Sequence, residues 1–164
     1  MSLMKSLLTG ACLCVLPLAA LADPALIFDL GGKFDKSFNE AAYVGAERWK
    51  AETGGTYKEL EMQSEAQREQ ALRRLAETGA NPIVMTGFAF GEVLGKIAPD
   101  YPDTKFVIID MVVEQPNVQS VVFAEPEGSY LAGVMAAKAS KSGTVSFVGG
   151  MDVPLIRKFQ CGYE

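Results

Sequence analysis

Two aspartates, two phenylalanines and an asparagine are the residues of this sequence best suited to holding a small ligand. Asp29 directly follows a short apolar run, the loop after it carries Phe34, Phe38 and Asn39, and Asp110 follows another apolar run. Phenylalanine rings can stack on a flat ring, an amide can donate and accept hydrogen bonds, and carboxylates accept them from hydroxyls. Carboxylates that face a pair of ribose-like hydroxyls beside an aromatic plate suit a nucleoside. The same carboxylates would repel the phosphate of a nucleotide.

Other interpretations of these residues stay open on spacing alone. Phe38 fits a core position under a helix as well as a stacking plate, and Asp29 and Asp110 also fit caps of neighbouring helices. A metal site built on Asp29 and Asp35 would have only two acidic ligands, which is too few for a well-defined site. The charged residues of the loop are expected to be solvated, namely Lys33, Asp35 and Lys36.

Composition excludes several classes of chemistry. The sequence has no histidine, which excludes Ser-His-Asp and Cys-His nucleophile systems and all histidine-based metal sites. A Walker phosphate loop requires Gly-Lys-Ser/Thr, whereas Lys33 is followed by Phe34. The net charge of −5 argues against a nucleic-acid partner, because such binding depends on basic residues that neutralise phosphates. An apolar share of 49% predicts a soluble globular protein with a buried core.

The first 22 residues are expected to be a secretory signal peptide. Lys5 precedes a nearly apolar run over 7–21, and Ala20-Leu21-Ala22 has the small residues of an A-x-A cleavage site. Neither Cys12 nor Cys14 has the upstream sequence of a lipid-anchored protein, so a free periplasmic protein is expected. Association with the outer face of the inner membrane stays open. Cleavage would leave Cys161 as the one cysteine, expected to be a small buried residue that forms no internal disulfide.

The remaining sequence alternates between apolar runs, which predict strands, and stretches with helical periodicity. Ser37 and Glu40, and again Ser64 and Gln67, have the spacing of a capping box, so each serine is predicted to start a helix. The arginines of the second helix are expected to be solvated: Arg68, Arg73 and Arg74. The predicted strands are 25–28, 57–62, 82–86, 105–109, 118–123 and 144–148. The predicted helices cover 37–53, 64–78, 90–97, 128–139 and a last segment that begins at 154.

This alternation, with nearly continuous apolar strands, predicts an α/β fold in which helices cover both faces of a parallel sheet. Ligands of such sheets bind beyond the carboxyl ends of the strands, where the chain turns toward the next helix. The polar loops after the strands are therefore the candidate site, and the rest of the chain is scaffold. The candidate residues at this edge are Asp29, Ser37, Phe38, Asn39, Gly87, Phe88, Asp110 and Met151.

The stretch from Asp29 to Asn39, with its Asp-Lys-Ser-Phe-Asn core, resembles the opening of the basic membrane protein family. Members of this family are substrate-binding proteins of ABC transporters, and the purine nucleoside receptors are the best known of them. Further blocks resemble the family in the same order along the whole mature chain. They are Gly87-Phe88 with Phe90, 101–106, Ile109-Asp110, 127–133, 148–154 and Phe159 with Gly162-Tyr163.

The resemblance implies a type I periplasmic binding protein, in which two lobes close on a ligand like a hinge. The first lobe would cover 23–123, and 124–164 would be the crossover and the incomplete start of a second lobe. By the family pattern Phe38 would stack on the base, with Asn39, Asp29 and Asp110 near the sugar. The remaining candidates would line the walls, with Ser37, Gly87 and Phe88 on the first lobe and Met151 on the second.

The expected function is that of a monomeric periplasmic protein that binds a nucleoside, by first choice a purine nucleoside, and delivers it to an inner-membrane ABC permease. No catalysis, cofactor or metal is expected. Since the family has two complete lobes, the sequence is expected to be a fragment that supplies half of a pocket. Two alternatives remain at this point: a nucleoside hydrolase that uses Asp29 and Asp35 with a metal, and a ligand sensor of the same fold.

Overall fold

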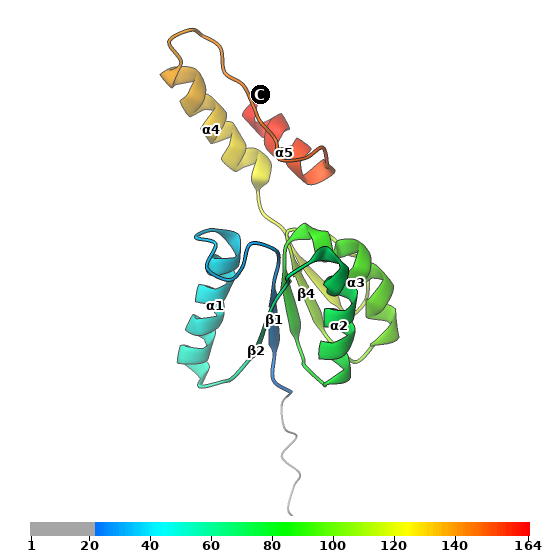
Figure 1. Cartoon of the computed structure of the whole chain (residues 1–164). Helices are drawn as coiled ribbons and strands as arrows, with labels where there is room; N and C mark the ends of the chain where they lie inside the picture. The colour runs from blue at the N-terminus through cyan, green and yellow to red at the C-terminus, as the bar shows by residue number, and fades with distance from the viewer. Residues whose placement is uncertain (1–21) are drawn as a thin grey trace, which may run out of the picture.

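The computed structural model describes residues 22–164, and the predicted signal peptide lies outside this range except for Ala22. Five parallel strands form one sheet, in the order β2-β1-β3-β4-β5 (Figure 1). The parallel α/β arrangement predicted from the sequence is therefore confirmed. The strands are β1 (Ala25–Phe28), β2 (Lys58–Glu61), β3 (Ile83–Thr86), β4 (Phe106–Ile109) and β5 (Val118–Val121).

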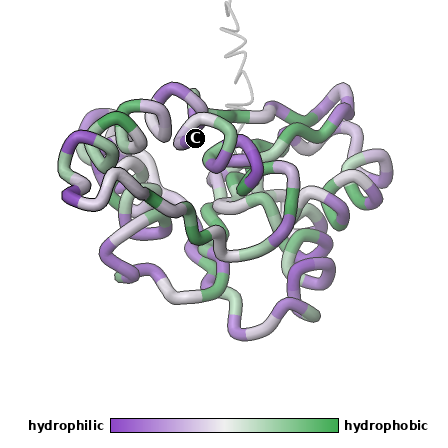
Figure 2. Tube along the Cα trace, turned by 90° about the horizontal axis from the view of Figure 1, so that it is seen from above, coloured by the Kyte–Doolittle hydropathy of each residue, from purple (hydrophilic) through white to green (hydrophobic). Residues whose placement is uncertain are grey.

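Helices lie on both faces of this sheet, with α1 on one side and α2 and α3 on the other (Figure 1). Short 3₁₀ turns over 65–67, 88–90 and 98–100 flank α2 and α3. Hydrophilic stretches gather along the outer helices and turns (Figure 2). None of the helices found between residues 22 and 164 is long and apolar enough to cross a bilayer. The helices are α1 (Phe38–Thr53), α2 (Arg68–Glu77), α3 (Gly91–Ile97), α4 (Glu125–Ala139) and α5 (Pro154–Tyr163).

The hydrophobic core lies between the sheet and the α2–α3 side. Strand residues that alternate along β3 and β4 enter it, as the period of two in a strand requires. Leu72 and Leu75 of α2 are buried there as predicted. Full burial of a side chain of this size stabilises the fold by about 1.5–3 kcal/mol relative to exposure. The largest fully buried side chains of the core include those of Ile27, Leu72, Ile83, Met85, Phe90, Leu94, Ile97, Phe106 and Ile108.

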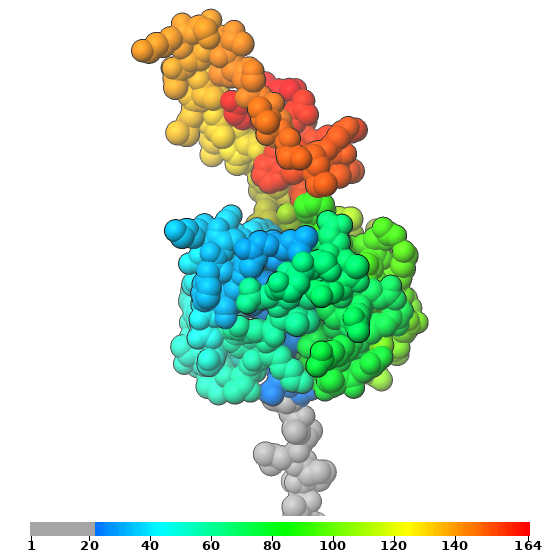
Figure 3. All heavy atoms as spheres, in the orientation of Figure 1, coloured from blue at the N-terminus to red at the C-terminus, as the bar shows by residue number. Residues whose placement is uncertain are grey.

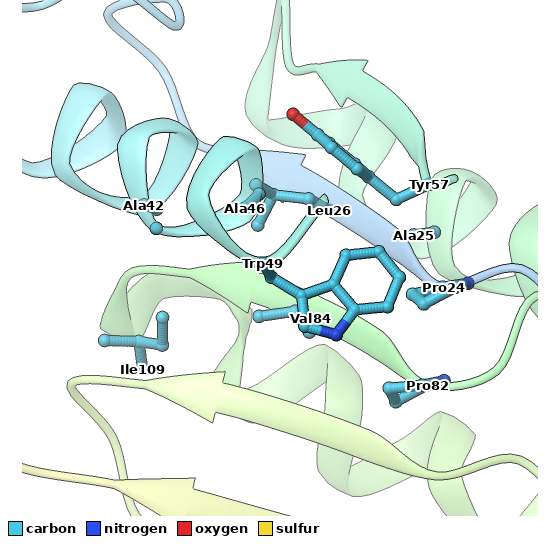
Figure 4. A pocket seen from close by; sticks show the side chains of 11 residues that line it. Pro24, Ala25, Leu26, Ala42, Ala46, Trp49, Tyr57, Pro82, Val84 and Ile109 are labelled. Atoms are coloured by element: carbon cyan, nitrogen blue, oxygen red, sulfur yellow. The ribbon is translucent and has the colours of Figure 1, made fainter. Parts of the chain in front are cut away.

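The opposite face of the sheet is only partly covered by α1. Val84 and Ile109 point to this face, because their neighbours Ile83 and Ile108 point into the core. An apolar hollow of about 470 Å³ remains between α1 and the sheet (Figure 4). Small residues of α1 leave this space open, and the Trp49 ring lies across one end of it. The hollow is lined by Pro24, Ala25, Leu26, Ala42, Gly45, Ala46, Trp49, Tyr57, Pro82, Val84 and Ile109.

The last two helices form a separate pair that stands off the sheet layer on a narrow neck (Figure 3). They approach closely at two glycines: a Cβ on Gly133 would clash with the Tyr163 carbonyl oxygen, and a Cβ on Gly162 would clash with the Pro126 carbonyl oxygen. Any larger residue at either position would push α4 and α5 apart. The neck is the short segment between β5 and α4.

Two expectations for the C-terminal part are wrong. No strand forms over 144–148, and Val148 is 93% exposed. A strand is stabilised by ladder hydrogen bonds to a neighbour, and within the described residues nothing pairs with this segment. Cys161 is exposed rather than buried, since it lines an open surface hollow beside α4. The helix predicted over 128–139 is present but begins earlier, at Glu125.

Candidate functional site

The carboxyl ends of three neighbouring strands bring together the candidates that follow them. Asp29, Gly87 and Asp110 come directly after β1, β3 and β4, which are adjacent in the sheet. The register pairs Thr86 with Ile109, so the loops after β3 and β4 leave the sheet at the same level. The predicted binding edge is therefore formed by residues from three separate parts of the sequence.

Asn39 connects two of these loops and is 3% exposed. Its amide nitrogen donates to the carbonyl oxygens of Asp29 and Gly32, both at 3.1 Å. Its Oδ1 accepts hydrogen bonds from the Asp29 N–H at 3.2 Å and from the Thr86 hydroxyl at 2.8 Å. Two donors and two acceptors are the full capacity of an asparagine amide. Asn39 therefore fixes the 29–39 loop against β1 and β3, which makes it a structural member of the site.

Asp35 caps α1, in place of the predicted capping box. Its carboxylate accepts hydrogen bonds from the backbone N–H groups of Ser37, Asn39 and Glu40 at 2.8–3.1 Å. The Ser37 side chain forms no cap hydrogen bond, so that prediction is wrong, as is the expectation of a solvated Asp35. Partial desolvation raises the pKa of Asp35, but the three N–H donors outweigh it and hold the pKa below its ordinary value. Because its carboxylate accepts these three hydrogen bonds, Asp35 is not available as the second acidic ligand of the metal site considered with Asp29.

Asp29 is held by Arg68, which the sequence analysis expected to be solvated. Nη2 of Arg68 lies 2.9 Å from Asp29 Oδ1, and the arginine side chain is only 10% exposed. The guanidinium also lies over the Phe90 ring, 5.5 Å from its centroid. The other carboxylate oxygen of Asp29 lies 3.2 Å from the place of a Cβ on Gly87, whose φ is +102°. Glycine is therefore required at 87 both by the backbone and by the aspartate beside it.

Asp110 has no such partner. Its backbone N–H donates to the Val121 carbonyl at 2.7 Å, and its φ of 76° is uncommon for a residue with a side chain. No hydrogen bond to its carboxylate is formed by any of residues 22–164. Burial raises the pKa of the Asp110 carboxyl, the negative charge of Glu125 raises it further, and Lys158 acts in the opposite direction. A positive φ and a half-buried carboxylate to which no side chain donates are typical of a ligand-binding position.

Phe38 stands at the mouth of a cleft rather than in the core. It is 37% exposed, and its ring meets that of Phe123 edge to face, with centroids 6.5 Å apart. The other exposed ring of the loop, Phe34, instead packs edge to face on Tyr43 of α1 at 5.4 Å. The cleft measures about 480 Å³ and opens between the sheet edge and the α4–α5 pair. It is lined by Phe38, Asp110, Phe123, Ala124, Glu125, Gly128, Ser129, Ala132 and Phe159.

The remaining candidates lie at different distances from this cleft. Ser37 is exposed on the loop before α1, and Phe88 is half-buried at the turn before α3. Met151 is 53% exposed and lines a different hollow, formed with Asp152 and Arg157 in front of α5. Thus Phe38 and Asp110 share the cleft, Asp29, Asn39 and Gly87 support it from the sheet, and Met151 is not brought to it.

Seven residues of the cleft were not among the candidates, and four of these carry a polar or aromatic side chain: Phe123, Glu125, Ser129 and Phe159. These four lie on the neck and on the last two helices. Ser129 and Phe159 belong to blocks that resemble the family, but nothing in the sequence singles out any of the four as a ligand contact. Glu125 could not be recognised from the sequence, because acidic residues are common at helix N-termini and its burial is visible only in the structure. Within residues 22–164 no group of three or more acidic or cysteine side chains is placed to hold a metal ion.

A family model described as ABC transporter substrate-binding protein, PnrA-like (Bmp) matches residues 24–164. The chain belongs to this family. The resemblance to the basic membrane proteins found in the sequence is therefore confirmed. Its members are substrate-binding proteins of ABC transporters, and the family match extends over the sheet, the cleft and the α4–α5 pair.

Two curated relatives show how similar family members are. An ABC transporter nucleoside-binding protein, BmpA, of Lactococcus lactis subsp. cremoris is 35% identical over 146 residues, which cover 85% of this chain and 41% of that protein. An uncharacterized lipoprotein of Pyrococcus horikoshii is 38% identical over 145 residues, which cover 85% of this chain and 36% of that protein. The chain thus spans well under half of the length of these relatives.

The fold is also that of a solved family structure. The crystal structure of an ABC transporter system solute-binding protein from Aeropyrum pernix K1 superposes with a TM-score of 0.75 at 34% sequence identity. The match covers 87% of this chain and 42% of that one. The periplasmic-binding-protein type of fold expected from the resemblance is thereby confirmed for the part of the chain that is compared.

Proposed function

We propose that this chain provides one lobe and the crossover of a substrate-binding protein of an ABC importer, and that it binds a nucleoside at the cleft. The cleft itself carries this proposal, because it combines the exposed Phe38 ring with the half-buried Asp110 carboxylate, which accepts no hydrogen bond from residues 22–164. The relative named as a nucleoside-binding protein supports the ligand class. A purine nucleoside is the first choice, since a bicyclic base offers the larger face for stacking.

Each cleft residue has a distinct role in the proposal. The Phe38 ring stacks on the base, with the edge of Phe123 behind it. The Asp110 carboxylate accepts hydrogen bonds from the sugar hydroxyls, and a hydrogen bond to a charged group is worth about 1.5–3 kcal/mol. Asp29, at the same edge, is held in place by its ion pair with Arg68. Two carboxylates at one edge favour a neutral ligand over a phosphorylated one.

The proposed lobe boundary coincides with the neck. The first lobe is 23–123, and 124–164 begins the second, so the cleft lies between the two. A ligand that contacts both sides favours the closed arrangement by the contacts available only there. No bond of the ligand is made or broken in this scheme. A monomer exported to the periplasm would present the closed form to an inner-membrane permease. Relatives named as ABC transporter proteins and lipoproteins support this placement.

Calorimetry with inosine, ribose and inosine monophosphate tests the ligand class on this chain. We expect inosine to bind at least about tenfold more tightly than either competitor, a difference of about 1.4 kcal/mol. Phe38→Ala should weaken inosine binding by a similar factor, because the stacking face is lost. Phe34→Ala is the matched control, since Phe34 is an exposed ring of the same loop that packs on Tyr43. Inosine binding no better than ribose would refute the proposal.

A further inference from the structure

Glu125 is a buried acid without a cationic partner. It is 5% exposed, and none of the lysines and arginines among the described residues forms a salt bridge with it. A carboxylate is rarely buried to this extent unless it is paired, because the loss of hydration is costly. Its place at the first position of α4 offsets part of that cost, since helix N-termini favour negative charge. The rest of the cost of burying this carboxylate is not offset by any salt bridge of the described residues. We therefore look for the role of Glu125 in the cleft that it lines.

We propose that Glu125 is a positioning residue of the ligand cleft: it holds Phe123 through the backbone and places a second negative charge beside Asp110. This inference rests on the proposed function, since it assigns Glu125 to the same site. It concerns the pH range over which that site binds.

The first part of the role is mechanical. Oε1 of Glu125 accepts a hydrogen bond from the backbone N–H of Phe123 at 3.3 Å. Phe123 lies in the neck, where no strand or helix fixes the backbone. Its ring in turn meets Phe38 edge to face. Glu125 therefore connects the start of α4 with the aromatic pair of the cleft, and its amide analogue retains the acceptor oxygen for this bond.

The second part of the role is electrostatic. The ionisable groups that act on the Asp110 carboxyl are Glu125 of α4 and Lys158 of α5, with opposite signs. The sugar hydroxyls of the ligand bind the ionised form of Asp110. Affinity must then fall as the pH drops through the pKa of Asp110 in the free protein. Burial and the charge of Glu125 both move this loss of affinity to a higher pH than an exposed aspartate would give.

The test measures inosine affinity by calorimetry between about pH 4 and pH 8 for the whole chain and three variants. Glu125→Gln should move the acid limb of the affinity profile to lower pH, because one like charge is removed. Lys158→Gln should move it to higher pH, because the opposing charge is removed. Asp110→Asn should weaken binding at neutral pH and flatten the acid limb. A purely structural Glu125 would change affinity equally at every pH.

Two outcomes overturn the inference. One is an acid limb that Glu125→Gln leaves in place, and the other is a shift of the same sign for the glutamate and lysine variants. If the wild-type chain binds no inosine at any pH, the proposed function fails, and the inference is still decided by NMR titration of the Asp110 carboxyl carbon. Its pKa should then be lower in Glu125→Gln and higher in Lys158→Gln than in the wild-type chain. Equal pKa values in all three would refute it.

Discussion

Replacement of Asn39 by alanine should destabilise the protein strongly, although Asn39 was first considered as a ligand contact. The variant removes four hydrogen bonds from a side chain that is 3% exposed. A typical net contribution is about 0.5–1.5 kcal/mol for each bond. Two of the four groups keep a second partner, since the Thr86 hydroxyl also contacts the Ile27 carbonyl and the Asp29 N–H also reaches that hydroxyl.

The two carbonyl oxygens of Asp29 and Gly32 lose the donor that Asn39 supplies to them. Counting these in full and the other two in part gives a loss of about 2–4 kcal/mol in the free energy of unfolding. That is a large fraction of the free energy of unfolding of a natural domain, which is about 5–15 kcal/mol. Urea denaturation followed by circular dichroism measures it, with unchanged m-value as the sign that the same unfolding transition is observed.

Ser37→Ala is the matched control, because Ser37 lies in the same loop and its side chain forms no cap hydrogen bond. It should change the free energy of unfolding by less than about 0.5 kcal/mol. The reasoning would be refuted if Asn39→Ala cost less than about 1 kcal/mol, or if both variants cost the same. In either case the amide network would not be what holds the loop against the sheet.

Three further perturbations follow from the same edge. Arg68→Met should lower the free energy of unfolding by about 1–3 kcal/mol in urea titrations, because Asp29 would keep a partly buried charge without its partner; an unchanged midpoint would contradict this. Gly87→Ala should lower the free energy of unfolding by more than about 1 kcal/mol, because the backbone there has a positive φ and the Asp29 carboxylate lies against the new Cβ. Gly45→Ala should be neutral or stabilising, because Gly45 lies in a helix with nothing within 4 Å of the new Cβ; thermal melts compare the two variants. Asp35→Asn should destabilise the protein at neutral pH and have no effect at strongly acidic pH. The pKa of Asp35 is lowered in the folded state, so its contribution is present above the unfolded pKa and is lost as the pH falls through the folded value.

The sheet was predictable because its information is local. Each of the five strands coincides with a predicted strand, to within two residues at either end. The strands β1, β3 and β4 come from apolar runs, whereas β2 has the sequence Lys-Glu-Leu-Glu and is mostly exposed. Continuous apolar runs are buried on both faces, and the alternation with helices fixes the parallel order. The run over 144–148 has the same local pattern and forms no strand, because pairing depends on a neighbour as well as on composition.

The site was predictable only where strand ends determine it. The positions of Asp29, Gly87 and Asp110 at one edge follow from the parallel sheet alone. The state of each side chain depends on partners far away in the sequence. Arg68 is separated from Asp29 by 39 residues, and nothing in its helix distinguishes it from the exposed arginine Arg74. Two acceptors, Asp35 and Ser37, compete for the same N–H groups, and only the three-dimensional loop shows which of them caps α1.

The partly covered face of the sheet determines what tryptophan fluorescence can report. The single tryptophan of the chain, Trp49, lies on the apolar hollow and is 39% exposed. Trp49 lies eleven residues after Phe38 on α1. At 1.5 Å per residue, the two side chains start about 16 Å apart along the helix axis, so Trp49 is far from the ligand cleft. Its emission should therefore stay constant when a ligand enters the cleft. A polypeptide segment that came to rest on the bare side of β3 and β4 would exclude water from the indole and shift its emission to the blue. The chain thus carries an intrinsic optical probe for anything that covers this face of the sheet, which calorimetry with a ligand of the cleft does not report.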